Sequence, residues 1–140
     1  MQGQLKKSYT INAPKARVWE ALTNPRLIKQ YFFNTEAVSD WKEGSTIIYR
    51  GTWEGKPYED RAVILKLIPL QELTINFWSS RTGKEDRPEN YSRHSYLLEE
   101  GKGKTLLTLV QPNNLKNGDT RSKAWQHWDT VIAGLKKVVE

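Results

Sequence analysis

Cysteine is absent from the 140-residue sequence, and histidine occurs only twice. The lack of cysteine excludes disulfides, thiol chemistry and zinc sites built on thiolates, and it fits a reducing compartment. No segment approaches the roughly 20 consecutive apolar residues of a membrane span, and residues 1–7 lack the apolar core of a signal peptide. We therefore expect a cytoplasmic protein without a membrane span.

The residues that carry common chemistries are also sparse. His94 and His127 lie far apart without a convincing carboxylate partner, so we expect no metal site. No serine has a general base at motif spacing, and no glycine-rich phosphate loop precedes a helix, so neither a triad nor a cofactor is expected. The carboxylate pairs 59–60 and 99–100 are predicted to be solvated turn residues, because neighbouring strand residues point to opposite faces. The sequence contains no complete catalytic constellation.

Composition favours one globular domain spanning residues 1–140. Hydrophobic residues make up 37% and charged residues 27% of the sequence, which is ordinary for a folded domain. The net charge is +6, but the cations are spread along the chain, so we expect a solvated basic surface and no nucleic-acid partner. Six Trp and six Tyr are many for this length, and such side chains fill cores or line apolar pockets.

The first part of the sequence predicts a strand and two short helices. Residues 4–11 alternate loosely between polar and apolar side chains, as in a strand. Pro14 stands where a helix begins, and apolar residues then recur at helical spacing up to Leu22. Pro25 ends this helix, because the residue before a proline avoids the helical conformation. A second short helix follows over residues 26–31.

The remainder predicts strands and one long helix. Apolar and β-branched segments alternate with turn residues, and the predicted strands cover residues 45–50, 61–68, 73–78, 92–98 and 105–111, with a hairpin connection around Gly55. Polar loops are expected over residues 81–89 and 113–119. A last helix of about 20 residues, roughly 30 Å long, is predicted to begin at Asp119 or Thr120.

This order of elements predicts an α+β fold, β-α-α-β(six strands)-α. A multistranded antiparallel sheet has an apolar face that another layer must cover, and the last helix is the element long enough to cover it. We therefore expect a curved antiparallel sheet wrapped around a long C-terminal helix. The space between them holds either core side chains or a cavity.

Four passages carry a resemblance to a known group of proteins. They are residues 11–25, residues 41–44 followed by Ile47 and Tyr49, residues 64–77, and residues 125–140. In this order they resemble the START and birch-pollen-allergen-like helix-grip superfamily (SRPBCC). Within it, the best match is the family of homologues of the C-terminal domain of the heat-shock chaperone ATPase activator. The resemblance covers essentially the full length.

The resemblance implies a helix-grip fold with an internal hydrophobic cavity, but it does not imply one activity. Members include lipid carriers, cyclases, hormone receptors and many bacterial proteins of undefined role. The eukaryotic activator grips its chaperone with a separate N-terminal domain, for which 140 residues leave no room.

Strand alternation predicts which side chains face the last helix. With inward residues of the helices, they predict a ligand cavity that has apolar walls and a few polar groups. The predicted lining is Trp19, Ile28, Phe32, Ile47, Tyr49, Trp53, Ile75, Phe77, His94, Tyr96, Leu107, Leu109, Trp125, Trp128 and Ile132. The alternative is that the same aromatic side chains fill a solid core.

His94 is the polar residue of most interest in this set. Facing inward beside Tyr96, it would orient a ligand or act as a base near neutral pH. The alternative is a strand histidine bonded to a neighbour or facing water.

The leading hypothesis is therefore a small-molecule binding protein that holds a hydrophobic or amphipathic ligand between the sheet and the last helix. A second hypothesis is a protein-interaction module that modulates a heat-shock chaperone ATPase or another protein partner. A third is a cyclase-like enzyme in which His94 takes part. No catalytic residue, metal or cofactor is assigned.

Overall fold

The computed structural model describes the backbone of residues 4–32, 34–78, 85–112 and 118–140, and the side chains there except at residues 4, 5, 53, 88, 112 and 118–127. The elements are β1 (Gln4–Ile11), α1 (Lys15–Thr23), α2 (Pro25–Tyr31), β2 (Glu36–Val38), β3 (Thr46–Trp53), β4 (Lys56–Ile68), β5 (Glu72–Trp78), a 3₁₀ turn (Pro88–Asn90), β6 (Ser92–Gly101), β7 (Lys104–Pro112) and α3 (Gly118–Val139). Six strands follow the two short helices, the number that the sequence predicts, and five of them, β3 to β7, correspond to predicted ranges.

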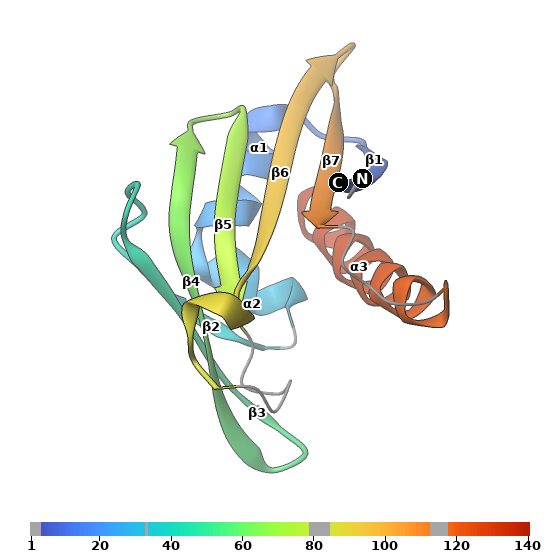
Figure 1. Ribbon diagram of the computed structural model, residues 1–140. Coiled ribbons are helices and arrows are strands. Elements are labelled where there is room, and N and C mark those ends of the chain that lie inside the picture. Colours follow the sequence, from blue (N-terminus) through green and yellow to red (C-terminus); the bar gives the residue numbers. More distant parts are fainter. Residues whose placement is uncertain (1–3, 33, 79–84, 113–117) are drawn as a thin grey trace.

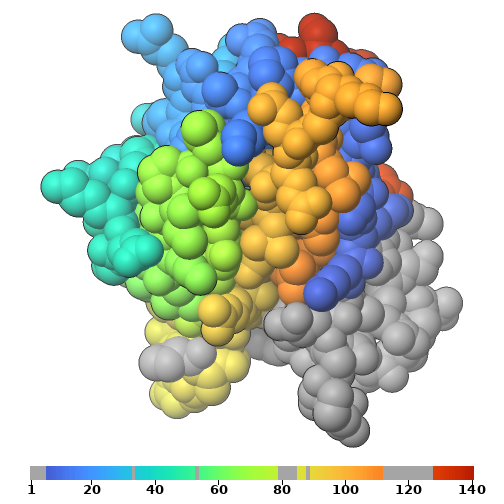
Figure 2. Space-filling model, turned by 90° about the horizontal axis from the view of Figure 1, so that it is seen from above, coloured from blue at the N-terminus to red at the C-terminus, as the bar shows by residue number. Residues whose placement is uncertain are grey.

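The strands form one antiparallel sheet in the order β1-β7-β6-β5-β4-β3-β2. The sheet curves, and all three helices lie on its concave side, with α3 facing β7 and β1 (Figure 1). Seen from above, the turns β4–β5 and β6–β7 come toward the viewer beside the blue atoms of α1 (Figure 2). This arrangement confirms the predicted α+β helix-grip fold, in which the sheet wraps around the C-terminal helix.

Two details of the sheet were not predicted. Strand β2 has only three residues, too few for an alternating pattern to stand out. Strand β4 has an irregular register between Ile64 and Lys66, so that Ile64 pairs with Ile75 while Lys66 pairs with Thr74. Such a bulge shifts the alternation by one residue, which brings Leu67 onto the concave side with the core.

Hydrogen bonds to side chains hold the N-terminal ends of α1 and α2 in place. The backbone N–H of Lys15, in the first turn of α1, donates to the Glu100 carboxylate of β6 over 3.0 Å. A carboxylate at a helix N-terminus satisfies a free N–H and complements the positive end of the helix dipole. The Asn24 side chain accepts from the backbone N–H of Arg26 over 3.0 Å and caps α2 in the same way.

The C-terminal part of α3 is anchored to α1, to β1 and to the connection between them. Arg17 of α1 donates from Nε to the carbonyl oxygen of Val139 and from Nη2 to that of Val138, each over 3.1 Å. The Asp129 carboxylate accepts a hydrogen bond of 2.7 Å from Nζ of Lys7, which lies on β1. The Glu140 carboxylate accepts from the backbone N–H of Asn12 over 2.9 Å. These bonds fix the orientation of the helix relative to the sheet.

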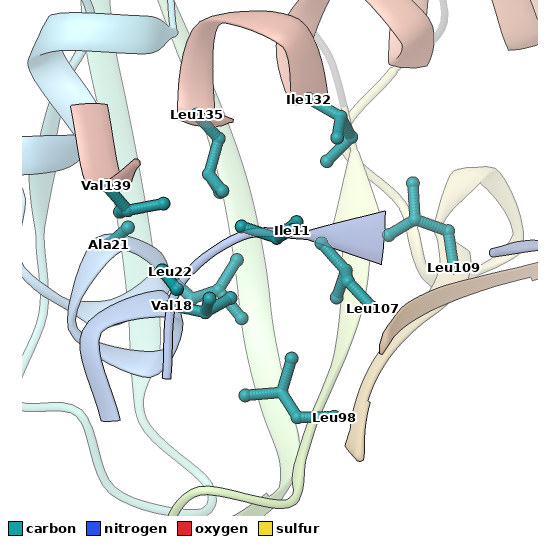
Figure 3. Close-up of a cluster of buried hydrophobic side chains, with 11 residues drawn as sticks. Ile11, Val18, Ala21, Leu22, Leu98, Leu107, Leu109, Ile132, Leu135 and Val139 are labelled. Atoms are coloured by element: carbon teal, nitrogen blue, oxygen red, sulfur yellow. The ribbon is translucent and has the colours of Figure 1, made fainter. Parts of the chain in front are cut away.

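The core consists of two clusters of buried side chains. The first joins α1, α3 and the β1–β7–β6 side of the sheet, and Figure 3 shows its members converging from these elements. The second lies under α2 and is formed by Ile28, Ala37, Ile47, Ala62, Ile64, Leu73 and Ile75. Partly buried Trp19, Tyr31 and Tyr96 pack against both clusters, so they occupy the boundary between them. Among the residues described, no helix is long and apolar enough to cross a membrane.

Candidate functional site

A small cavity lies between the sheet and α3, at the boundary between the two core clusters. Its volume is about 30 Å³. Its lining comes from α1, α2, β3, β5, β6 and α3, and consists of Leu22, Ile28, Tyr31, Tyr49, Leu73, Tyr96, Trp128, Val131, Ile132 and Leu135. A cavity of about 10–15 Å³ already holds a water molecule, whereas drug-sized ligands occupy roughly 300–1,000 Å³. This cavity is therefore far smaller than a drug-sized ligand, and the described side chains around it fill most of the space there.

Three tyrosines supply the polar groups of this cavity. Tyr31 comes from α2, Tyr49 from β3 and Tyr96 from β6. The Tyr31 hydroxyl donates to the carbonyl oxygen of Ala21 over 2.7 Å. Among the described residues, the hydroxyls of Tyr49 and Tyr96 have no hydrogen-bond partner. Two donors thus face an otherwise apolar space.

Burial raises the pKa of all three tyrosine hydroxyls well above the usual range. For Tyr49, electrostatic interaction with the phenol of Tyr96 and then with the Asp60 carboxylate acts in the same direction. Desolvation disfavours the phenolate, and neighbouring negative charge disfavours it further. The three hydroxyls therefore stay protonated at physiological pH and remain donors.

A continuous row of aromatic rings runs from α2 across the concave face to α3. The ring centroids of Phe32 and Tyr49 are 6.2 Å apart, and those of Tyr49 and Phe77 are 5.9 Å apart. His94 follows at 5.7 Å from Phe77 and 5.8 Å from Trp128. Most of these contacts are edge-to-face, a favourable arrangement for aromatic pairs. The row presents an apolar wall toward α3.

His94 belongs to this wall. Its imidazole lies between Phe77 and Trp128, and burial lowers its pKa to about 4. The ring is therefore neutral at pH 7, and a group with so low a pKa is a weak general base under those conditions. Among the residues described, His94 makes no hydrogen bond.

Gln111 adds a second polar group to the concave face. It lies two residues after Leu109 on β7, and strand alternation places both side chains on the face that packs against α3. The side-chain nitrogen of Gln111 is buried and has no hydrogen-bond partner in the described part of the chain. Buried amide groups usually have partners, so this one calls for an explanation.

Asp60 differs from the sequence prediction, which made it a solvated turn residue. It lies within β4, directly opposite Tyr49, and only 3% of its surface is exposed. Its neighbour Glu59 points outward and pairs with Arg50 and Arg61. The two carboxylates do lie on opposite faces, but the strand is longer than predicted and carries Asp60 into the interior.

The predicted lining residues fall into several groups. Ile28, Tyr49, Tyr96, Trp128 and Ile132 line the cavity. Ile47, Ile75, Leu107 and Leu109 are core residues, and Trp19 packs between the clusters. Phe32, Phe77 and His94 belong to the aromatic row. The side chains of Trp53 and Trp125 lie outside those described, as does that of His127.

Sequence reasoning left Leu22, Tyr31, Leu73, Val131 and Leu135 out of the predicted lining. Leu73 shares the strand alternation of Ile75, and Leu135 shares the helical stripe of Trp128 and Ile132. Both could therefore have been predicted as lining residues from the sequence pattern. Nothing in the local sequence around Tyr31 indicates its bond to Ala21. In the described ranges, no group of three His, Asp or Glu side chains is placed to hold a metal ion.

Comparisons with known proteins agree with this fold. The solution structure of ChR145 from Cytophaga hutchinsonii is 41% identical in sequence with a TM-score of 0.83, and the match covers 96% of this chain and 92% of that one. The solution structure of the Aha1 dimer from Colwellia psychrerythraea is 20% identical with a TM-score of 0.77, covering 99% and 96% of the two chains. CalU16 from Micromonospora echinospora is 23% identical with a TM-score of 0.75, covering 98% and 76%. The last two show similarity of fold alone.

No curated protein matches the chain. Residues 12–140 match the family model described as activator of Hsp90 ATPase homolog 1-like protein. That range begins at the end of β1 and includes every residue that lines the cavity. The chain therefore belongs to the activator of Hsp90 ATPase homolog 1-like family, within the SRPBCC helix-grip superfamily.

Proposed function

We propose that the protein binds a hydrophobic or amphipathic small molecule between the concave face of the sheet and α3. The observation that carries this proposal is a pair of tyrosines that line the cavity and whose hydroxyls have no protein partner among the described residues, together with one buried amide nitrogen that also lacks a partner. The hydroxyls of Tyr49 and Tyr96 face the cavity, and the side-chain nitrogen of Gln111 is buried on the same face of the sheet.

Such groups would not stabilise a core that only maintains the fold. A buried donor that lacks a partner costs about 1–3 kcal/mol, and phenylalanine or leucine would fill the same space without that cost. Buried tyrosine hydroxyls normally find a partner. A bound molecule with polar atoms at these points would supply the partners, while the aromatic row would contact its apolar body.

The cavity of about 30 Å³ sets a condition on this proposal. A ligand larger than a few atoms must displace side chains that occupy this space in the structure. Trp128 and the row that includes Phe77 and His94 are the side chains whose rotation enlarges the space between sheet and helix. Binding therefore involves rearrangement of the ligand site, and we expect it to be slower than simple docking.

The test is a binding screen of lipids and aromatic metabolites by thermal shift and native mass spectrometry. Val131→Phe places a bulky ring in the cavity from a buried position of α3, and it should abolish binding of any hit. Ala133→Phe is the matched control, because residue 133 is exposed on the same helix and adds equal bulk outside the cavity. A hit that binds both variants equally binds elsewhere. A library without any stabilising compound would contradict the proposal.

A protein-interaction role is the second candidate, and the family description favours it. The large hydrophobic side chains exposed in the described part of the chain, Val38, Leu65 and Leu106, come from three different strands and form no continuous patch. This role would therefore depend on polar contacts. A pull-down with the cognate heat-shock chaperone, followed by an ATPase assay, tests it, and absence of both binding and stimulation would contradict it. The cytoplasm remains the expected compartment, because the sequence lacks cysteine.

A further inference from the structure

The chemistry of the cavity restricts the kind of ligand that it would accept. Tyr31, Tyr49 and Tyr96 bring three hydroxyls to a space whose other walls are leucine, isoleucine, valine and tryptophan side chains. The Tyr31 proton is already donated to the Ala21 carbonyl oxygen. Two donors therefore remain, one on β3 and one on β6, and both tyrosines line the same small cavity, where Tyr96 is near enough to act on the pKa of Tyr49.

The electrostatic surroundings disfavour an anion at this point. No Lys, Arg or His side chain belongs to the described cavity lining. The Asp60 carboxylate is buried opposite Tyr49 and raises the cost of a second negative charge nearby. A buried charge without a partner of opposite sign is strongly unfavourable. The acceptor that fits the two hydroxyls is consequently neutral.

A carbonyl oxygen meets this requirement better than other neutral groups. It has two lone pairs in one plane, so it accepts a hydrogen bond from each hydroxyl at once. A ligand hydroxyl or amine would bring its own donor into an apolar space, where that donor would need a further partner. A hydrocarbon would leave both tyrosines unsatisfied.

We propose that Tyr49 and Tyr96 form a two-donor site for the carbonyl oxygen of a neutral, otherwise apolar ligand held between the sheet and α3. This inference rests on the proposed function, since it assigns a chemical class to the same ligand. The aromatic row from Phe32 to Trp128 contacts the apolar body of the molecule.

The experiment uses four small probes that share one carbon skeleton or nearly so. They are butyrophenone, its secondary alcohol, the hydrocarbon butylbenzene and the anion phenylbutyrate. Their affinities for the wild-type protein are measured by ligand-observed NMR. We expect butyrophenone to bind about tenfold more tightly than butylbenzene, the ratio that corresponds to one good net hydrogen bond. The alcohol and the anion should both bind more weakly than the ketone.

Variants then locate the effect. The double variant Tyr49→Phe/Tyr96→Phe should bring the ketone-to-hydrocarbon ratio to within about twofold of unity, because no donor remains. Tyr91→Phe is the control, since that hydroxyl bonds to Asp86 on the surface, and the wild-type ratio should persist. The infrared carbonyl stretch of bound butyrophenone should lie at lower frequency in the wild type than in the double variant. The wild-type affinity series keeps the test decisive even if the double variant fails to fold.

The possible results separate the inference from the proposed function. If butyrophenone and butylbenzene bind the wild type equally, an apolar site exists but the carbonyl site is refuted. If the ratio persists in the double variant, or phenylbutyrate or the alcohol binds more tightly than the ketone, the assignment to Tyr49 and Tyr96 is refuted. If none of the four probes binds, the carbonyl site is refuted, while the library screen described above decides the proposed function separately.

Discussion

The hydroxyl group of Tyr31 donates a hydrogen bond of 2.7 Å to the carbonyl oxygen of Ala21, an oxygen that has no partner within its own helix. In an α-helix that carbonyl would accept from the N–H four residues later. Residue 25 is proline and has no N–H to donate. The break that separates α1 from α2 thus creates a free acceptor, and the last residue of α2 satisfies it.

Removing this hydroxyl should destabilise the protein. In Tyr31→Phe the Ala21 carbonyl keeps its buried position but loses its partner, which costs about 1–3 kcal/mol. Urea denaturation followed by tryptophan fluorescence measures the change. Tyr91→Phe removes a surface hydroxyl that bonds to Asp86, and it should change stability by less than about 0.5 kcal/mol. Equal effects in the two variants would contradict this account.

Gly134 should tolerate no large side chain. A Cβ atom there would lie 3.1 Å from the Cβ of Tyr31 and 3.4 Å from its carbonyl oxygen, so α2 and α3 touch at this point. Gly134→Leu should force the helices apart and cost about 1–3 kcal/mol, despite the better helix propensity of leucine. Ala133→Leu, at the neighbouring exposed position, should be close to neutral. Thermal unfolding of the pair by circular dichroism checks this prediction.

His94 should make stability depend on pH below neutrality. Its folded-state pKa is about 4 against an ordinary value of 6.5, so the unfolded chain binds the proton more readily. The contribution of His94 to the free energy of unfolding is then constant above pH 6.5 and falls as the pH drops from 6.5 to 4. At the lower end this group has removed up to about 3 kcal/mol of stability. Denaturation curves across that range measure the slope.

Variants of the two histidines isolate this contribution. His94→Phe keeps an aromatic ring between Phe77 and Trp128 but cannot be protonated, so most of the slope between pH 6.5 and 4 should vanish. His127→Gln removes the other histidine of the chain, and the slope should remain. A slope that survives His94→Phe unchanged would assign the pH dependence to other groups.

The β6–β7 turn offers a stabilising change. Its central residues Lys102 and Gly103 both have positive φ, 54° and 76°, as a type I′ turn requires. Asparagine adopts this conformation more readily than lysine, so Lys102→Asn should raise stability by about 0.5–1 kcal/mol. Lys104→Asn makes the same chemical change within a strand and should bring no gain. A rise in Tm for the first variant alone is the expected result.

Much of the fold followed from patterns that are local in sequence. The alternation of Leu73, Ile75 and Phe77 predicts one face of β5, and all three pack on the concave side. The helical stripe from Trp128 to Leu135 predicts the buried face of α3 in the same way. Such patterns are informative because one burial pattern repeats over many residues.

The features that escaped prediction depend on single contacts across the fold. Whether Asp60 is buried depends on how far β4 extends past the turn, and an alternating pattern does not mark that end. The bond from Tyr31 to Ala21 joins two helices whose relative orientation is set by tertiary packing. The cavity volume depends on how closely Tyr49, Tyr96 and Trp128 approach one another, and a list of inward side chains leaves these distances undetermined.

The pairing of β1 with β7 has a consequence for synthesis of the chain. Ile11 pairs with Thr105, and Gln4 pairs with Pro112, so the first strand finds its partner only when the last strand has been made. Because the ribosome adds roughly 5–20 residues per second, β1 remains unpaired for on the order of 5 to 20 seconds during synthesis. Lys6 and Lys7 lie in β1, and charged lysines disfavour pairing of an edge strand with strands of other molecules. The nascent sheet therefore closes as a late step, and the concave site forms only with it.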